Sequence, residues 1–144
     1  MFRFALAALA VVALAVCLSE AQQPKQQPPS GTWKKTAGDY NLSFQFKGRS
    51  LQFSMAEGNK TMDVFADFGT SKDGYVFGRV NKIERNGLDG GPEAGDLFSF
   101  RFVMTSDTLT VSDLRGTDSD QAKNLIQGEY KGAPAPTKKK IDAK

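Results

Sequence analysis

The chain has 144 residues, a single cysteine and no histidine, which excludes Ser-His-Asp and Cys-His catalysis and nearly all zinc or copper sites. We therefore expect a protein that is not an enzyme and has no cofactor or metal, with carboxylate chemistry as the remaining catalytic alternative. The net charge of +3 is unevenly distributed. Residues 31–130 hold twelve basic and fourteen acidic side chains, whereas residues 131–144 hold five lysines and one aspartate. A mildly acidic domain with basic ends argues against nucleic-acid binding.

Residues 1–21 have the pattern of a secretory signal peptide. Arg3 gives a positive start, Phe4–Leu18 is an unbroken apolar run, and small residues occupy the −3 and −1 positions of a cut after Ala21. A helix of that run covers roughly 22 Å, which is shorter than a ~30 Å hydrocarbon core. The pattern therefore predicts a secreted or periplasmic protein whose mature chain has no transmembrane segment.

Cys17 offers an alternative, because a cysteine near the end of a signal peptide can carry a lipid anchor. The residue before it is Val16, whereas lipid attachment normally requires a small residue there. Cleavage after Ala21 is favoured, and it removes the only cysteine, so we expect a mature chain without disulfides.

Two segments of low complexity flank one predicted domain, residues 31–131. Residues 22–30 are a Pro/Gln-rich linker, and residues 132–144 are predicted to be a disordered Lys-rich tail. Lys138, Lys139 and Lys140 could contact an anionic surface such as a cell-wall polymer or lipid headgroups, although a solvated tail is the favoured interpretation. The domain is large enough for one hydrophobic core, and we expect a monomer.

Alternation of apolar and polar residues dominates the domain. It is clearest over residues 40–47 and 50–57, which Gly48 and Arg49 join as a hairpin. Phe65 breaks the parity of the third such run, which indicates either a bulge or a strand with apolar residues on both faces. Eight strands are predicted, at residues 32–37, 40–47, 50–57, 61–68, 74–84, 96–105, 108–114 and 128–131.

Two segments depart from this pattern. Residues 85–95 are rich in glycine and predict a long loop. Ala122, Leu125 and Ile126 have the spacing of one helical face, and they follow the possible N-cap residues at 117–120, so we expect a short helix over about 119–127.

Consecutive hairpins predict an all-β, antiparallel up-and-down meander. An open sheet of eight strands would expose two long edges, and closure into a small barrel removes them. Trp33 in the first strand and Tyr130 in the last are the expected closing partners, and a flattened sandwich is the alternative.

Gly31-Thr32-Trp33 at the start of the first strand resembles the Gly-x-Trp that opens lipocalins and related calycin barrels, and the short helix near the C-terminus is similar to theirs. The resemblance implies that the tryptophan packs across the closed end of the barrel and that an arginine from a late strand lies near it. Arg101 and Arg115 are the possible arginines, and Arg115 is preferred. The chain is shorter than a typical lipocalin and lacks the family's disulfide.

The resemblance implies a binding protein for a small apolar ligand, and the phenylalanine-rich strands supply the side chains for a cavity wall. The predicted wall residues are Tyr40, Phe44, Phe53, Phe77, Phe100 and Phe102. The alternative is an envelope or extracellular interaction protein whose core is solid and has no ligand cavity.

The acidic residues of this sequence do not have the spacing of a calcium site or of a catalytic acid–base pair. The aspartates at 118 and 120 and those at 89 and 96 do not have the spacing of an EF-hand loop. Asp63 and Asp67 would lie ~13 Å apart along a strand, too far for paired acid–base chemistry.

Overall fold

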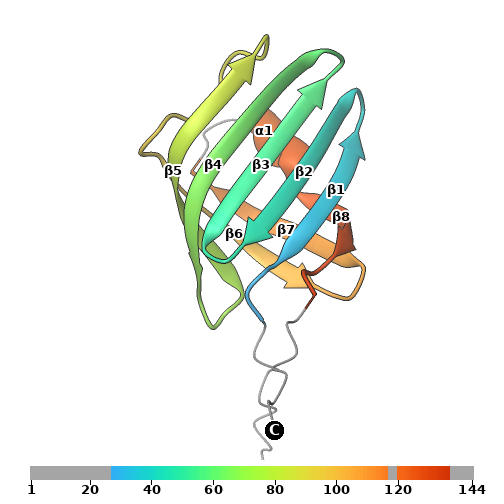
Figure 1. Cartoon of the computed structure of the whole chain (residues 1–144), viewed down its shortest axis with the longest axis vertical. Helices are drawn as coiled ribbons and strands as arrows, with labels where there is room; N and C mark the ends of the chain where they lie inside the picture. The colour runs from blue at the N-terminus through green and yellow to red at the C-terminus, as the bar shows by residue number, and fades with distance from the viewer. Residues whose placement is uncertain (1–26, 117–119, 137–144) are drawn as a thin grey trace, which may run out of the picture.

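The computed structural model describes residues 27–116 and 120–136, which form a closed barrel of eight antiparallel strands in chain order (Figure 1). The predicted all-β barrel, with one short helix before the last strand, is confirmed. The predicted signal peptide, Cys17 and Lys138 to Lys140 lie outside the described residues. The elements are β1 (Gly31–Ala37), β2 (Tyr40–Lys47), β3 (Ser50–Glu57), β4 (Lys60–Thr70), β5 (Tyr75–Asn86), β6 (Leu97–Met104), β7 (Thr108–Arg115), α1 (Asp120–Ile126) and β8 (Gly128–Ala133).

The first four strands are joined by three equivalent hairpins. Gly38, Gly48 and Gly58 each begin a two-residue turn with a φ close to +60°. A positive φ at the first turn residue matches the right-handed twist of the flanking strands and is accessible to glycine without strain. Glycines ten residues apart therefore set both the strand length and the register of this half of the barrel.

The barrel closes where β1 pairs with β8. Trp33 lies opposite Gly132, and a Cβ on Gly132 would lie 2.1 Å from the carbonyl oxygen of Thr32, so the two strands approach closely because this residue is glycine. β8 continues to Ala133, two residues beyond the predicted strand. The backbone N–H of Ala135 then donates to Ser30 Oγ at 3.2 Å. The first two residues of the predicted tail therefore belong to β8, and the last residue of the predicted linker contacts the segment that follows it.

Two bulges change which residues face inward. Between β4 and β5 the register shifts after Phe65, so Asn81 of β5 has no partner and Ile83 returns to the inner face. The sequence predicted a bulge at Phe65, and the structure places the extra residue on the neighbouring strand. A second shift between β6 and β7 includes Asp113, whose φ is +50°, and brings Leu114 into the core.

The core is a single cluster inside the barrel, and its largest fully buried side chains are Trp33, Tyr130, Phe100 and Phe102. No polar or charged side chain in the described ranges is fully buried. Aromatic and aliphatic burial therefore supplies the stability of this interior, at about 25 cal/mol per Å² of apolar surface.

In the view of Figure 1, α1 is drawn behind β2 and β3, away from the end where β1 begins and β8 ends. It starts and ends within one residue of the predicted helix, and none of its residues is fully buried. In the part of the chain that the structure describes, no helix has the length and apolar character needed to cross a membrane.

Candidate functional site

The barrel interior contains a cavity of about 640 Å³ beside α1. Strands β2 to β7, the loop between β5 and β6, and α1 all contribute to its wall. The volume falls within the range of about 300–1,000 Å³ that small-molecule sites occupy. A hollow of this size is what the hypothesis of a small-molecule site requires.

Four of the six predicted wall residues line the cavity: Tyr40, Phe44, Phe53 and Phe100. Phe44 is central, because its ring centroid lies 4.9 Å from that of Phe53, 5.5 Å from that of Phe100 and 5.0 Å from that of Tyr130. These tilted and edge-to-face contacts hold the rings in fixed orientations. The Phe44 ring is therefore packed against three other aromatic rings.

The prediction for Phe77 is wrong, since 52% of this residue is exposed on the outer face of β5. The inner positions of β5 belong to Val76, Gly78 and Val80, and the ring of Phe98 fills the space beside Gly78. Tyr75 and Phe77 share one face of this strand and Val76 and Val80 share the other, and the aliphatic face is the inner one.

The prediction for Phe102 is correct in direction but wrong in depth. The side chain faces inward and is 1% exposed, yet it does not line the cavity. Alternation identifies the inner face of a strand, but position along the barrel axis depends on strand tilt and register, which a single sequence does not provide.

Several wall residues were missed. Met55, Met62 and Phe98 have the same inward parity as the predicted residues, so alternation alone would have included them. Leu88 in the long loop and Leu125 of α1 had no such signal, because their contribution depends on how these segments fold back over the barrel.

The residues predicted to close the barrel divide into two groups. Trp33 and Tyr130 are both fully buried, and Trp33 Nε1 donates to the carbonyl of Ser30 at 2.8 Å beside the β1–β8 seam. Arg115 does not fulfil its predicted role. β7 ends at the cavity, where 73% of the Arg115 side chain is exposed and its guanidinium pairs with Asp113.

The C-terminal end of α1 is held from inside the barrel by Lys35. Its ammonium donates to the carbonyl of Leu125 at 2.9 Å and to that of Gln127, and it lies 5.6 Å from the ring centroid of Tyr130. Burial lowers the pKa of Lys35. A cation at these carbonyls also complements the negative end of the helix.

Tyr130 and Gln127 hold the same end of the helix. The Tyr130 hydroxyl donates to the carbonyl of Ile126 at 2.6 Å, and burial raises its pKa. Gln127 Oε1 accepts a hydrogen bond from the backbone N–H of Leu114 at 2.8 Å. Leu125 and Ile126 are thereby fixed as part of the cavity wall.

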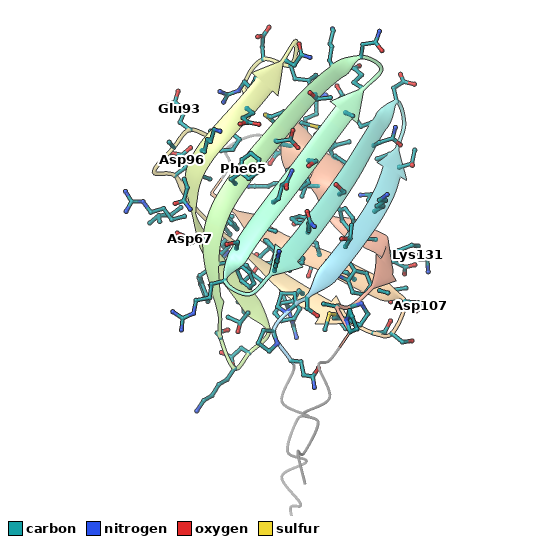
Figure 2. All side chains as sticks on the ribbon, in the orientation of Figure 1. Phe65, Asp67, Glu93, Asp96, Asp107 and Lys131 are labelled. Atoms are coloured by element: carbon teal, nitrogen blue, oxygen red, sulfur yellow. The ribbon has the colours of Figure 1, made fainter. Side chains whose placement is uncertain are left out.

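The loop between β5 and β6 forms the other side of the cavity entrance. Arg85 donates to the carbonyls of Gly90 and Pro92 at 2.9 and 2.7 Å, and Asp96 accepts from the backbone N–H of Glu93 at 2.8 Å. Figure 2 shows Glu93 and Asp96 on this loop beside β5. The loop is therefore shaped by its own hydrogen bonds.

The polar side chains of the cavity lie at its exposed edge. Asp89, Asp96, Arg115 and Gln121 line the cavity and are exposed, whereas the deeper wall is apolar. Among the described residues, no three acidic side chains are grouped so that they could hold a metal ion. The arrangement is suited to apolar contact inside and polar contact at the entrance.

Comparison of the chain with protein-family models, with curated proteins and with solved structures found no match.

Proposed function

We propose that this chain is a non-catalytic binding protein that takes a small apolar ligand into the barrel. The observation that supports the proposal is the cavity of about 640 Å³, lined by phenylalanine, methionine and leucine side chains. Burial of ligand surface against such a wall is favourable by about 25 cal/mol per Å². The rings give contact area at little entropic cost, because their neighbours already fix them.

The chemistry of the wall limits the ligand. A polar group deep in the cavity would lose its hydration without a partner there, at a cost of about 1–3 kcal/mol. A ligand that fits therefore has a continuous apolar body and any polar group at one end. That end would meet Arg115 or Gln121 at the entrance.

The proposal is tested by thermal-shift measurements with fatty acids, retinoids and hydrophobic dyes, followed by titration of the best compound. Ala66→Phe is the informative variant, because Ala66 is 3% exposed and lines the cavity, so a ring at this position occupies ligand space. We expect the ligand to raise the melting temperature of the wild type, and Ala66→Phe to weaken binding by about tenfold or more, which corresponds to 1.4 kcal/mol.

Phe102→Leu serves as the control for stability, because Phe102 is in the core but does not line the cavity. This variant should lose stability and retain its affinity for the ligand. If no compound in the screen raises the melting temperature, or if Ala66→Phe binds as tightly as the wild type, the proposal fails.

Export and the lipocalin-like relationship belong to the same proposal. We propose that the chain is cleaved after Ala21 and acts outside the cytoplasm, for which N-terminal sequencing of the exported protein is the direct test. Gln22 as the first residue is the expected result, and a lipid-modified Cys17 would contradict it. Contact between Lys138, Lys139 and Lys140 and an anionic surface is tested by binding to anionic vesicles after deletion of residues 137–144.

A further inference from the structure

A second hollow lies on the outer face of the barrel, on the opposite side of the wall from the cavity. It crosses β4, β5 and β6. Within it the backbone of Asp67 in β4 lies opposite that of Arg79 in β5, and the backbone of Gly69 lies opposite that of Phe77. Figure 2 labels Asp67, which marks its β4 side. The lining residues are Arg49, Asp67, Phe68, Gly69, Phe77, Gly78, Arg79 and Leu97, and we call this hollow the outer groove.

The apolar part of the outer groove is an exposed ring beside an open space. Phe77 is 52% exposed, and its cross-strand neighbour Gly69 has nothing within 4 Å of the place where a Cβ would lie. Leu97 is 70% exposed at the other side. Tyr75 stacks against Phe77 with ring centroids 6.1 Å apart, which fixes the ring. One flat apolar face is thus presented next to a gap of side-chain size.

The polar part of the outer groove consists of two arginines and one aspartate. The ion pairs found within the described ranges are Lys82–Glu84, Arg115–Asp113 and Lys131–Glu129. Arg49 and Arg79 therefore have no carboxylate partner in that part of the chain. Both are exposed, on a domain that is otherwise mildly acidic. A guanidinium offers paired N–H donors that match a carboxylate, and Asp67 offers acceptors for hydroxyl groups.

We propose that the outer groove binds a uronic acid unit of an acidic polysaccharide. The apolar C–H face of the sugar ring packs on Phe77 over the space left by Gly69. The sugar carboxylate accepts hydrogen bonds from Arg79 and Arg49, and its hydroxyls donate to Asp67. One sugar ring carries all three features together: a flat apolar face, a carboxylate and hydroxyl donors.

An acidic peptide fits the outer groove less well. It has carboxylates for the arginines, but its acidic side chains have no flat apolar face for Phe77 and no hydroxyl group to donate to Asp67. Of the groove residues only Leu97 also borders the cavity, so Phe77→Ala and Arg79→Gln leave the cavity wall unchanged and the two proposals can fail independently.

The test uses the purified full chain and trigalacturonic acid, with binding followed by isothermal titration calorimetry at physiological ionic strength. Phe77→Ala and Arg79→Gln are each expected to weaken binding by about tenfold. The control variants Phe65→Ala in β4 and Lys82→Gln in β5 remove a ring and a cation outside the groove, where Lys82 Nζ lies 5.9 Å from the Phe65 ring centroid. These two variants are expected to bind within twofold of the wild type.

Two further measurements show whether binding depends on the sugar carboxylate and whether it depends on the lysines of the C-terminal segment. A neutral trisaccharide should bind more weakly than the uronate, because it lacks the carboxylate. Substitution of Lys138, Lys139 and Lys140 by glutamine should leave trisaccharide binding intact. The proposal is overturned if trigalacturonic acid does not bind, if Phe77→Ala and Arg79→Gln bind like the wild type, if the lysine substitutions abolish binding, or if an acidic peptide binds as tightly. Fluorescence of the buried Trp33, measured in parallel, shows that each variant is folded.

Discussion

Asp113, near the end of β7, combines an unusual backbone conformation with two side-chain contacts at the surface. Its φ of +50° places it in the left-handed region, where aspartate and asparagine are tolerated better than most residues. Its carboxylate accepts a hydrogen bond from the Tyr75 hydroxyl at 3.0 Å and pairs with Arg115. These two contacts hold the pKa of Asp113 below its ordinary value, with the Tyr75 hydrogen bond as the larger cause.

Asp113→Asn isolates the carboxylate, since asparagine retains the backbone preference and nearly the same shape. Because the folded state lowers the pKa of Asp113, the charged form stabilises the fold above about pH 4, and this contribution is lost as the pH falls through the folded pKa. We expect Asp113→Asn to unfold at lower urea concentration than the wild type at pH 7. The difference should shrink towards pH 3.

Fluorescence of Trp33, the only tryptophan and a fully buried one, reports this unfolding. Asp67→Asn is the control, because Asp67 is exposed and has no ion pair among the described residues. A difference for Asp113→Asn that is the same at pH 3 and pH 7 would contradict a role for the charge.

At the scale of elements, α1 is the part of the cavity wall with the least intrinsic stability. A helix of seven residues does not persist alone in water, and none of its residues is fully buried. Its C-terminal end is held by Lys35, Tyr130 and Gln127, each of which comes from a strand or from the segment next to one. The cavity entrance is therefore bordered by an element that depends on tertiary contacts.

Lys35→Met should destabilise the packing of α1 on the barrel without destabilising the strands. The change removes two hydrogen bonds from a charged donor, each contributing about 1.5–3 kcal/mol, so amide exchange in residues 120–127 should rise by about tenfold or more. Exchange in β2 to β4 should change little. Lys34→Met is the matched control, because Lys34 is exposed on the outer face of the same strand. Equal acceleration throughout the barrel would show global destabilisation instead of release of α1.

For the whole molecule, the β1–β8 seam decides whether the sheet is a barrel or an open meander. The first strand of this barrel pairs with the last at three positions, and Gly132 lies opposite the buried Trp33. Closure leaves no free sheet edge at this point, and free edges are sites of aggregation. The stability of the whole barrel therefore depends on a contact between residues about a hundred positions apart in the sequence.

Gly132→Ala should open or strain the seam, because the added Cβ would lie 2.1 Å from a backbone oxygen that cannot move without breaking the pairing. We expect a loss of at least about 2 kcal/mol, which lowers the melting temperature by roughly 8 °C or more. Gly69→Ala is the control, since Gly69 lies inside β4 with open space around it. A melting temperature within 2 °C of the wild type would show that β8 can shift without cost.

The sequence by itself determined the fold class, the strand order and each strand boundary to within two residues. The reason is physical: alternation of apolar and polar residues and glycine turns act over a few residues, so each hairpin is encoded locally. The same alternation identified Phe44, Phe53 and Phe100 as inward-facing. It also identified Tyr40, the fourth predicted residue that lines the cavity.

Only the tertiary structure decided the depth of each residue in the barrel and the contribution of the irregular segments. Phe102 and Phe100 share one face of β6, yet only Phe100 reaches the cavity. Phe77 lies outside because it alternates with the inward-facing Val76 and Gly78, and the ring of Phe98 fills the space beside Gly78. Arg115 lies at the cavity entrance, where β7 ends. Depth, closure and the position of α1 result from contacts between distant segments, and no local pattern in the chain encodes them.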